Sequence, residues 1–330
     1  MNNVKNICVV TGNRADYDLL HPLLTRIIND DDINLHLVAT GSHMSSEFGL
    51  TYKQIEDDGF IIKHKVEILP SSDTAEGVIK SMGLGLIGFA EVFDKIDIDI
   101  LILLGDRFEI FVAATAATVA RIPIAHLSGG ETTEGAFDEA FRHSITKMSH
   151  LHFTTTEFYR NRVIQLGEHP KRVFNVGAFV MDNINEMQLL SKDDLQKSMG
   201  FKFGKRNLLI TFHPTTLEDS SSEEQFYNLL TALSNIEDTQ LIFTKSNSDI
   251  GGRIINKMID EYVELNHQKA VSYSSLGRLR YLSTMQYIDG VIGNSSSGLV
   301  EAPSFKIGVV NIGNRQKGRA KSSSVIDCDS

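Results

Sequence analysis

The sequence has no tryptophan and only two cysteines among its 330 residues. Cys8 lies in an apolar run near one end of the chain and Cys328 near the other, so we expect neither a disulfide framework nor a thiolate metal cluster. Long apolar runs are also missing. None approaches the roughly 20 residues that span a bilayer, and no apolar core with a basic flank opens the chain. We therefore expect a cytoplasmic protein without a membrane partner.

Basic residues are in the minority, with 32 Lys and Arg against 42 Asp and Glu and a formal net charge of -10. A general nucleic-acid binder needs a positive field around its phosphate-binding surface, so this composition excludes that class of protein. Any phosphate must be bound locally, by a few well-placed groups. A chain of this length with 42% hydrophobic residues can bury a large core, and it suits two α/β domains better than one.

Short apolar runs rich in Val, Ile and Leu alternate with amphipathic stretches of helical length, which is typical of parallel strands covered by helices. The expected strands cover residues 7–10, 35–40, 61–66, 98–104, 123–127, 151–154, 173–176, 208–212, 241–244, 286–292 and 307–311. The clearest expected helices cover residues 18–29, 78–93, 108–121, 137–149 and 157–166, and Gly167 is expected to stop the last of them. The predicted fold class is α/β, with two doubly wound Rossmann-like domains and a cleft between them.

A looser, polar stretch over residues 168–206 separates the two halves, and we expect domains at residues 1–175 and 176–330. Ligands of doubly wound sheets bind at the carboxyl ends of the strands, so polar and glycine-rich segments directly after strands are the candidate sites. One such segment is 41–46, whose His43 is an expected substrate contact.

The first strand runs into TGNRADYD, where Arg14 can make a two-pronged contact with a phosphate near the start of the next helix. An ordinary surface arginine, or one paired with Asp16, is the alternative. In the second half, GNSSSGLVEAP offers Ser295 and Ser296 to a diphosphate and Glu301 to a ribose diol. The alternative there is a plain serine helix cap.

A basic cluster in GNRQKGR, with Arg315, Lys317 and Arg319, is a candidate anion site, and a solvated charge run is the competing interpretation. His213 in TFHPTT ends the first strand of the second half, where it is either catalytic or a satisfied structural histidine. No HExxH or Cys–His set is present, so a metal site is not expected.

Two segments carry candidate acid/base groups. ILLGDRFE places Asp106 and Arg107 directly after the most apolar strand of the first half, where a carboxylate can act as a general base or merely cap the next helix. HLSGGETTEGAFDEAFRHS is the densest polar stretch, and it contains Glu131, Asp138 and Arg142. Carboxylates beside glycines at a strand exit favour proton transfer, although Asp138 and Arg142 could instead form a simple ion pair along one helix.

Taken in order, the motifs resemble those of one family, the hydrolysing UDP-N-acetylglucosamine (UDP-GlcNAc) 2-epimerases of bacterial sialic-acid synthesis. The motifs that carry the resemblance are TGNRADYDLL, GDRFE, GGETTEGAFDEAFRHSITKMSHLHFTTTEFYRNRVIQLGE, HPTT, SNSDIGGR, GNSSSGLVEAP and GNRQKGR. They span nearly all of the chain, from Thr11 to Arg319, and are jointly specific although each alone is weak. Relatives of this family use UDP-diacetylbacillosamine or GDP-GlcNAc.

The resemblance implies a GT-B-like fold, a nucleotide-sugar substrate, a homo-oligomer (dimer or tetramer), and a reaction without NAD, metal or other cofactor. A base removes the C2 proton while UDP leaves by anti elimination, and water then adds to the glycal to release N-acetylmannosamine. By motif match, Asp106 and Asp138 correspond to catalytic carboxylates and His213 to a histidine near the diphosphate. The implied UDP contacts are Arg14, Asn247, Ser295, Ser296, Glu301 and Arg315. Arg107 and Arg142 are further expected substrate contacts.

The sequence departs from the family pattern at two places. Some relatives carry a catalytic glutamate directly before the paired glycines, where this sequence has Ser128, so Glu131 is the expected substitute. Relatives also continue beyond the position of Ser330 into a closing helix. A non-hydrolysing epimerase, a GT-B glycosyltransferase and a nucleotide-sugar sensor remain as alternatives.

Overall fold

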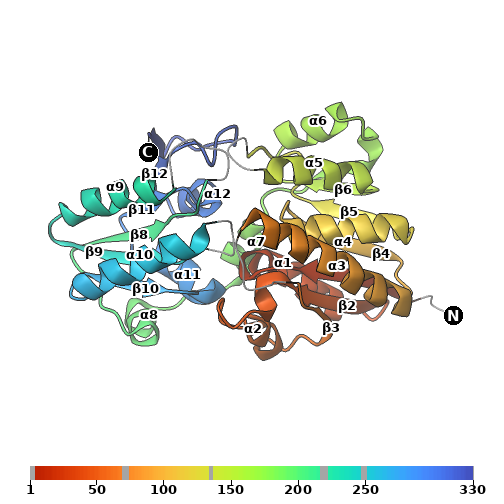
Figure 1. Ribbon diagram of the computed structural model, residues 1–330, viewed down its shortest axis with the longest axis horizontal. Helices are drawn as coiled ribbons and strands as arrows, with labels where there is room; N and C mark the ends of the chain where they lie inside the picture. The colour runs from red at the N-terminus through yellow and green to blue at the C-terminus, as the bar shows by residue number, and fades with distance from the viewer. Residues whose placement is uncertain (1–3, 69–73, 134–136, 216–221, 247–250, 330) are drawn as a thin grey trace. The chain divides into compact units, whose positions relative to one another are not determined.

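The computed structural model describes residues 4–68, 74–133, 137–215, 222–246 and 251–329 (Figure 1). By internal contacts the chain divides into two compact units. The first comprises Met1–Glu131 and Asp138–Asn185, and the second comprises Thr132–Phe137 and Glu186–Ser330. The short segment Thr132–Phe137 thus groups with the second unit although it lies within the sequence of the first.

The first unit is built on a parallel sheet with the order β3-β2-β1-β4-β5-β6-β7 in the described residues (Figure 1). Its strands are β1 (Lys5–Thr11), β2 (Ile33–Thr40), β3 (Ile62–Val66), β4 (Ile100–Leu104), β5 (Ile124–Leu127), β6 (Leu151–Thr154) and β7 (Val173–Asn175). The strand order reverses between β1 and β4, which is the position where doubly wound sheets bind ligands.

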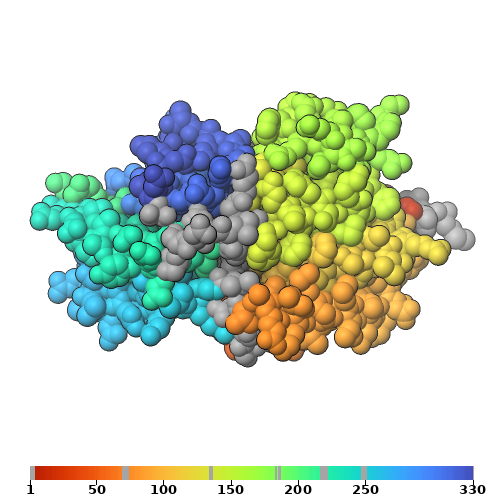
Figure 2. Space-filling view, turned by 45° about the horizontal axis from the view of Figure 1, so that its top comes forward, coloured from red at the N-terminus to blue at the C-terminus, as the bar shows by residue number. Residues whose placement is uncertain are grey.

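Helices cover this sheet because their apolar residues recur at three- and four-residue spacing. The helical segments are α1 (Arg14–Ile28), η1 (Gly41–Met44), α2 (Tyr52–Asp57), α3 (Ala75–Lys95), α4 (Phe108–Val119), α5 (Asp138–Met148), α6 (Glu157–Gln165), η2 (Pro170–Arg172) and α7 (Val180–Glu186). In α1, Tyr17, Leu20 and Leu24 pack on Val9 of β1 and Leu37 of β2. Helices α3, α4 and α5 lie side by side, and Figure 2 shows them as neighbouring bands from orange to yellow-green.

The second unit repeats the plan with a parallel sheet in the order β10-β9-β8-β11-β12-β13 in the described residues. Its strands are β8 (Arg206–Thr211), β9 (Thr239–Thr244), β10 (Ala270–Tyr273), β11 (Gly290–Gly293), β12 (Gly308–Ile312) and β13 (Val325–Cys328), and its helices are α8 (Lys192–Met199), α9 (Ser222–Ser234), α10 (Gly252–Leu265), α11 (Gly277–Met285) and α12 (Ser296–Ser304). Two apolar clusters form its core, one with Phe212 and Phe226, the other with Leu209 and Ile242. The strand order reverses between β8 and β11.

The predicted class, two doubly wound parallel α/β domains, is confirmed. Gly167, with a φ of 101°, follows the cap of α6 as predicted. The strand expected over residues 286–292 is wrong in its first half, since Gln286 caps α11 and β11 begins only at Gly290. Helix α1 begins at Arg14, four residues before the expected start, because the Asn13 side chain caps it. No described helix combines the length and the apolarity that crossing a membrane requires.

Candidate functional site

The carboxyl ends of the strands in each unit carry most of the residues singled out in the sequence. Parallel strands end at the same edge of a sheet, so the segments that follow them form one rim. In the first unit these segments follow β1, β2, β4 and β5. In the second unit they follow β8, β9, β11 and β12. We call these edges the first rim and the second rim and describe each by itself.

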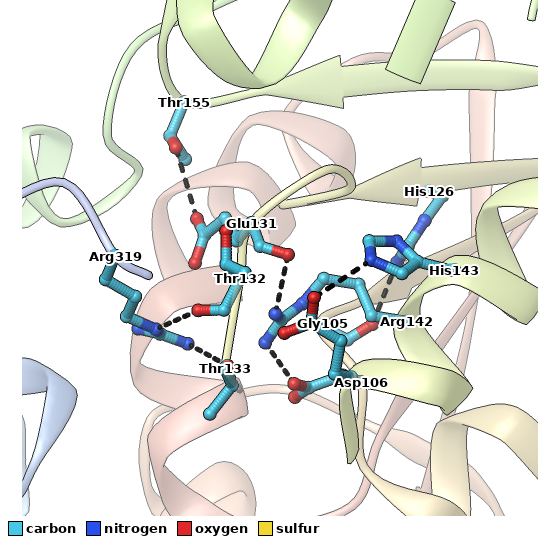
Figure 3. Close-up of polar contacts among 11 residues, drawn as sticks. Gly105, Asp106, His126, Glu131, Thr132, Thr133, Arg142, His143, Thr155 and Arg319 are labelled. Carbon is cyan, nitrogen blue, oxygen red and sulfur yellow. Dashed lines mark hydrogen bonds and ion pairs between the residues drawn. The ribbon is translucent and has the colours of Figure 1, made fainter. Parts of the chain in front are cut away.

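An arginine network organises the first rim (Figure 3). Arg142 of α5 donates from Nη2 to the Asp106 carboxylate, which follows β4, and from Nη1 to the Glu131 carbonyl at 2.8 Å. The Arg142 side chain is only 2% exposed, whereas that of Asp106 is 18% exposed. The buried cation therefore holds a partly exposed carboxylate in a fixed place. Asp106 does not cap α4, because the cap residue is Arg107.

A buried histidine supports the backbone beside Asp106. His126 of β5 lies 2.8 Å from the Gly105 carbonyl through Nε2 and 3.1 Å from the Thr146 hydroxyl through Nδ1. Burial lowers the pKa of His126 to about 4, so the ring is neutral at neutral pH. Since a carbonyl only accepts, Nε2 carries the proton and Nδ1 accepts from Thr146. This tautomer fixes the turn that presents Asp106.

Glu131 reaches the rim through a tight, left-handed turn. Ser128 has a φ of 62° and Gly130 a φ of 79°. A Cβ on Gly130 would lie 2.6 Å from the Tyr159 carbonyl oxygen, so only glycine fits there. The Glu131 carboxylate accepts a hydrogen bond from Thr155 at 3.1 Å. Asp138, the other expected carboxylate, is the first residue of α5, one turn before Arg142.

One further carboxyl group of the first rim, that of Glu109, was not identified from the sequence. Glu109, in the first turn of α4, is fully buried and lies 3.4 Å from the Nε of Arg107. Burial raises the pKa of Asp16 in α1 to about 7; Arg107 opposes this shift, and the charges of Glu109 and Asp106 add to it. A Cβ on Gly41 would lie 2.8 Å from Glu109 Oε1, so the backbone approaches this group closely. The sequence signal that could have identified Glu109 is its position as the last residue of the motif GDRFE.

His43 and Arg14 lie near the end of β1. His43 is fully buried in η1, with Nε2 3.0 Å from the Thr11 hydroxyl and Nδ1 2.8 Å from the Thr51 hydroxyl. Burial, with a further contribution from the Arg14 charge, lowers the pKa of His43 to about 3, so the ring is neutral. Arg14 is the first residue of α1 and is partly exposed. A partly exposed cation at a helix N-terminus suits an anion.

Asn294 organises the second rim. Its amide donates to the His213 carbonyl at 2.7 Å, and its side-chain oxygen accepts from the His213 N–H at 2.7 Å. The Asn294 carbonyl accepts from Arg315 at 3.2 Å and from Gln316 at 2.7 Å. The His213 ring lies 3.1 Å from the Ser246 hydroxyl, through Nδ1. Through Asn294 the structure thus brings together His213 and Arg315, which are 102 positions apart in the sequence.

The start of α12 carries the expected diphosphate residues. Ser295 is the N-cap, and its side chain accepts from the Ser297 N–H, so the plain helix-cap interpretation of Ser295 also holds. Ser296 is the first residue of α12, and Glu301 lies on the same helix, partly exposed. The Ser297 hydroxyl is hydrogen-bonded to Tyr281 of α11. Asn247 lies outside the described residues.

The basic cluster after β12 is divided among different roles. Arg315 bonds the Asn294 carbonyl, Lys317 is exposed, and Arg319 donates to the Thr132 carbonyl at 3.2 Å and to the Thr133 hydroxyl at 3.3 Å (Figure 3). The described ranges contain no group of three or more His, Cys, Asp or Glu side chains placed to hold a metal ion.

Comparisons with known proteins point to one family. The family described as UDP-N-acetylglucosamine 2-epimerase matches residues 25–330. The chain is 43% identical to a GDP/UDP-N,N'-diacetylbacillosamine 2-epimerase (hydrolyzing) of Campylobacter jejuni, over 98% of this chain and 84% of that protein. It is 41% identical to the polysialic acid biosynthesis protein P7 of Escherichia coli, over 98% and 82%. A solved UDP-GlcNAc 2-epimerase of Methanocaldococcus jannaschii, in complex with UDP-GlcNAc and UDP, matches with a TM-score of 0.79 at 17% identity, over 98% and 89%.

Proposed function

This chain belongs to the UDP-N-acetylglucosamine 2-epimerase family, and we propose that it is a hydrolysing 2-epimerase that converts UDP-GlcNAc and water to UDP and N-acetylmannosamine. The observation that carries the proposal is the paired arrangement of the first rim, where buried Arg142 holds Asp106 beside the Glu131 turn. Proton transfer at carbon needs a carboxylate that is both positioned and accessible to substrate. Asp106 meets both conditions.

The reaction has two steps that balance without an electron acceptor. A carboxylate takes the proton from C2 of the sugar while the C1–oxygen bond to the diphosphate breaks, which releases UDP and leaves a C1–C2 double bond. Water then adds its oxygen to C1, and a proton returns to C2 from the opposite face. The net change is hydrolysis with inversion at C2, so no redox cofactor takes part.

The proton-handling groups are assigned to the first unit. Asp106, Glu131 and Asp138 are the acid/base candidates, and Arg142 holds the first of these in place. Two further carboxyl groups lie beside Arg107, those of the partly exposed Asp16 and the fully buried Glu109. Neighbouring carboxyl groups acquire different pKa values, so one can donate a proton while another accepts one.

The nucleotide is assigned to the second unit. Arg315 and the N-terminus of α12, with Ser295 and Ser296, are suited to the diphosphate, and Glu301 to the ribose hydroxyls. His213, fixed beside Arg315 by Asn294, is the candidate acid for the leaving diphosphate oxygen. Arg14, His43 and Asn247 are further proposed substrate contacts.

UDP-N,N'-diacetylbacillosamine is a second candidate substrate, because the Campylobacter relative with 43% identity carries that name. The 41% identity to the polysialic acid protein supports the first candidate. The described rims contain no feature that separates one N-acyl sugar from the other.

Incubation with a panel of UDP- and GDP-linked N-acetyl sugars, with NMR identification of the released sugar, tests the proposal. We expect free UDP and N-acetylmannosamine to accumulate together, with deuterium at C2 when the reaction runs in deuterium oxide. Retention of UDP on the product would indicate a non-hydrolysing epimerase. Turnover that requires a sugar acceptor would indicate a glycosyltransferase, and UDP binding without any product would indicate a sensor.

A further inference from the structure

Asn294 follows β11 in the second unit and is fully buried, although it carries two donors and an acceptor on its side chain. We infer that Asn294 is a positioning residue that fixes His213 and Arg315 for UDP binding. The inference deepens the proposed function and rests on its assignment of UDP to the second rim. Asn294 acts through these two residues.

The side chain of Asn294 extends the hydrogen-bonded pairing of β8 with β11 beyond the last pair of backbone residues. The parallel ladder between these strands ends at Gly293, which is paired with Thr211, and the Asn294 N–H bonds the Thr211 carbonyl at 3.1 Å. Beyond this point the backbones separate. The Asn294 amide then bonds both the N–H and the carbonyl of His213, each at 2.7 Å. A side chain thus takes the place of the next strand residue and stops the His213 backbone from turning.

The close approach of the strands before Asn294 depends on a glycine. Gly293 has a φ of 136°, and a Cβ there would lie 2.0 Å from the Thr211 carbonyl oxygen. Only glycine tolerates both the dihedral angle and the contact. The backbone therefore delivers Asn294 to one place, directly beside His213.

The carbonyl of Asn294 holds the second residue of the pair. It accepts from Arg315 Nη1 at 3.2 Å and from Gln316 Nε2 at 2.7 Å, and Gln316 is 1% exposed. One residue consequently ties together the segments after β8, β11 and β12. Preorganised donors bind an anion better than mobile ones, because no ordering cost remains on binding.

The His213 ring has one further anchor besides the backbone that carries it. Its Nδ1 lies 3.1 Å from the Ser246 hydroxyl, and Ser246 is itself bonded through its backbone to Asn256, at 2.7 Å and 3.2 Å. Asn294 holds the backbone that carries the ring. Loss of its hydrogen bond should therefore change the position of the ring relative to Arg315, with the Ser246 contact as the remaining anchor.

Asn294→Asp tests the inference, because it keeps the size of the side chain and replaces the donor to the His213 carbonyl by an oxygen. We expect the Kd for UDP, measured by calorimetry at pH 8, to rise about 10-fold or more. Burial raises the pKa of a carboxyl group, so at acidic pH the new group regains a proton to donate and the affinity should partly recover. His213 after β8 and Arg315 after β12 face this group and titrate or carry charge, so each measurement is divided by that of the wild type at the same pH.

Asn207→Asp is the matched control. Asn207 lies in β8 at the opposite edge of the same sheet, is 4% exposed, accepts from the Gly204 N–H at 2.7 Å and donates to the Tyr287 carbonyl at 3.3 Å. Asn207→Asp should lower stability in a similar way but change the Kd for UDP less than about twofold, because Asn207 contacts neither His213 nor Arg315 in the described hydrogen bonds.

NMR signals of the His213 ring give a readout without ligand. They should move in Asn294→Asp and stay in place in Asn207→Asp. Unchanged UDP affinity in Asn294→Asp, an equal loss in Asn207→Asp, no recovery at low pH, or unmoved ring signals would each overturn the inference. Wild-type protein that binds UDP without turnover would overturn the proposed function alone. If it bound no UDP, the proposed function would fail and the ring signals would still decide the positioning role.

Discussion

The two rims share one topology but differ in chemistry. The first rim concentrates charge, with Asp106 and Arg142 in an ion pair and Glu109 beside Arg107. Around Asn294 the second rim is built from amides, hydroxyls and backbone groups, and Arg315 is bonded there to a backbone carbonyl. The topology therefore specifies where ligands bind, whereas the residues after each strand decide what happens to them.

The contrast has a physical reason. Groups that exchange protons need charges whose proton affinities are shifted, and buried neighbouring carboxyl groups supply that shift. Groups that hold a leaving diphosphate need fixed donors, and a neutral hydrogen-bonded frame supplies these without a charge that must be neutralised. The proposed division of work between the units follows from this difference.

Removal of the Asp106 charge should impair catalysis at the first rim and leave UDP binding at the second rim intact. It has the largest expected effect. We expect Asp106→Asn to lower turnover of UDP-GlcNAc roughly 100-fold or more, because an amide cannot take a proton from carbon. UDP affinity, measured by calorimetry, should stay within about threefold of wild type. Asp99→Asn is the control: its carboxylate bonds the Asn6 N–H and Lys5 just before β4, at the opposite edge of the sheet. Near-normal turnover in Asp106→Asn would make Asp106 a structural residue.

The glycines after β4 and β11 compare how tightly the two rims are packed. Gly105 has a φ of 80° with no atom within 4 Å of an added Cβ, whereas an added Cβ on Gly293 would lie 2.0 Å from a carbonyl oxygen. Both alanine variants meet backbone strain, but only Gly293→Ala also meets a steric clash. We expect Gly293→Ala to lower the free energy of unfolding by about 2 kcal/mol more than Gly105→Ala. Equal losses of unfolding free energy in denaturant titrations of the two variants would contradict the close contact between Gly293 and Thr211.

A variant of Arg315 tests whether the second rim binds UDP. Arg315→Ala should weaken UDP binding about 10-fold, because a fixed guanidinium makes charge-assisted bonds to phosphate. The effect should shrink at high salt. Lys317→Ala, two residues further at an exposed position, is the control and should change the Kd less than twofold. If calorimetry gave equal losses for the two variants, attraction by the basic segment as a whole would explain the binding.

The pH dependence of stability that Asp16 gives to the first unit tests a different property from the three variants above. Burial raises the pKa of Asp16 from 3.8 to about 7, so the folded protein binds a proton that the unfolded chain releases between these values. The free energy of unfolding should therefore fall as pH rises from 3.8 to about 7 and then level off. Asp16→Asn removes this loss, so its stability relative to wild type should be greater at pH 8 than at pH 5. A constant difference in denaturant midpoints would contradict the raised pKa.

Periodicity and motif position predicted much of this molecule. The Val-, Ile- and Leu-rich runs marked the buried strands, because a strand covered on both faces is apolar at every position. Strand β10, with the sequence AVSY, and β13, with VIDC, were not predicted. They are short and carry polar or exposed residues at the edges of the sheet, where burial does not impose an apolar run.

The partners of the site residues could not be predicted, because they are distant in sequence. Asn294 and His213 are 81 residues apart, and nothing in GNSSSG distinguishes a buried amide from the serines beside it. Arg142 lies four residues after Asp138, and this spacing suggested an ion pair within one helix. The structure pairs Arg142 with Asp106, 36 residues away, and the helix spacing alone gave no sign of this partner.

The segment Thr132–Phe137 makes the chain pass between the compact units three times, at 131/132, 137/138 and 185/186. A single proteolytic cut after Asn185 would sever one of these passages and leave the excursion attached to the N-terminal fragment. Its Thr132 and Thr133 would still be hydrogen-bonded to Arg319 of the C-terminal fragment. A C-terminal half produced alone, from Glu186 onward, would therefore lack a segment that groups with its own unit.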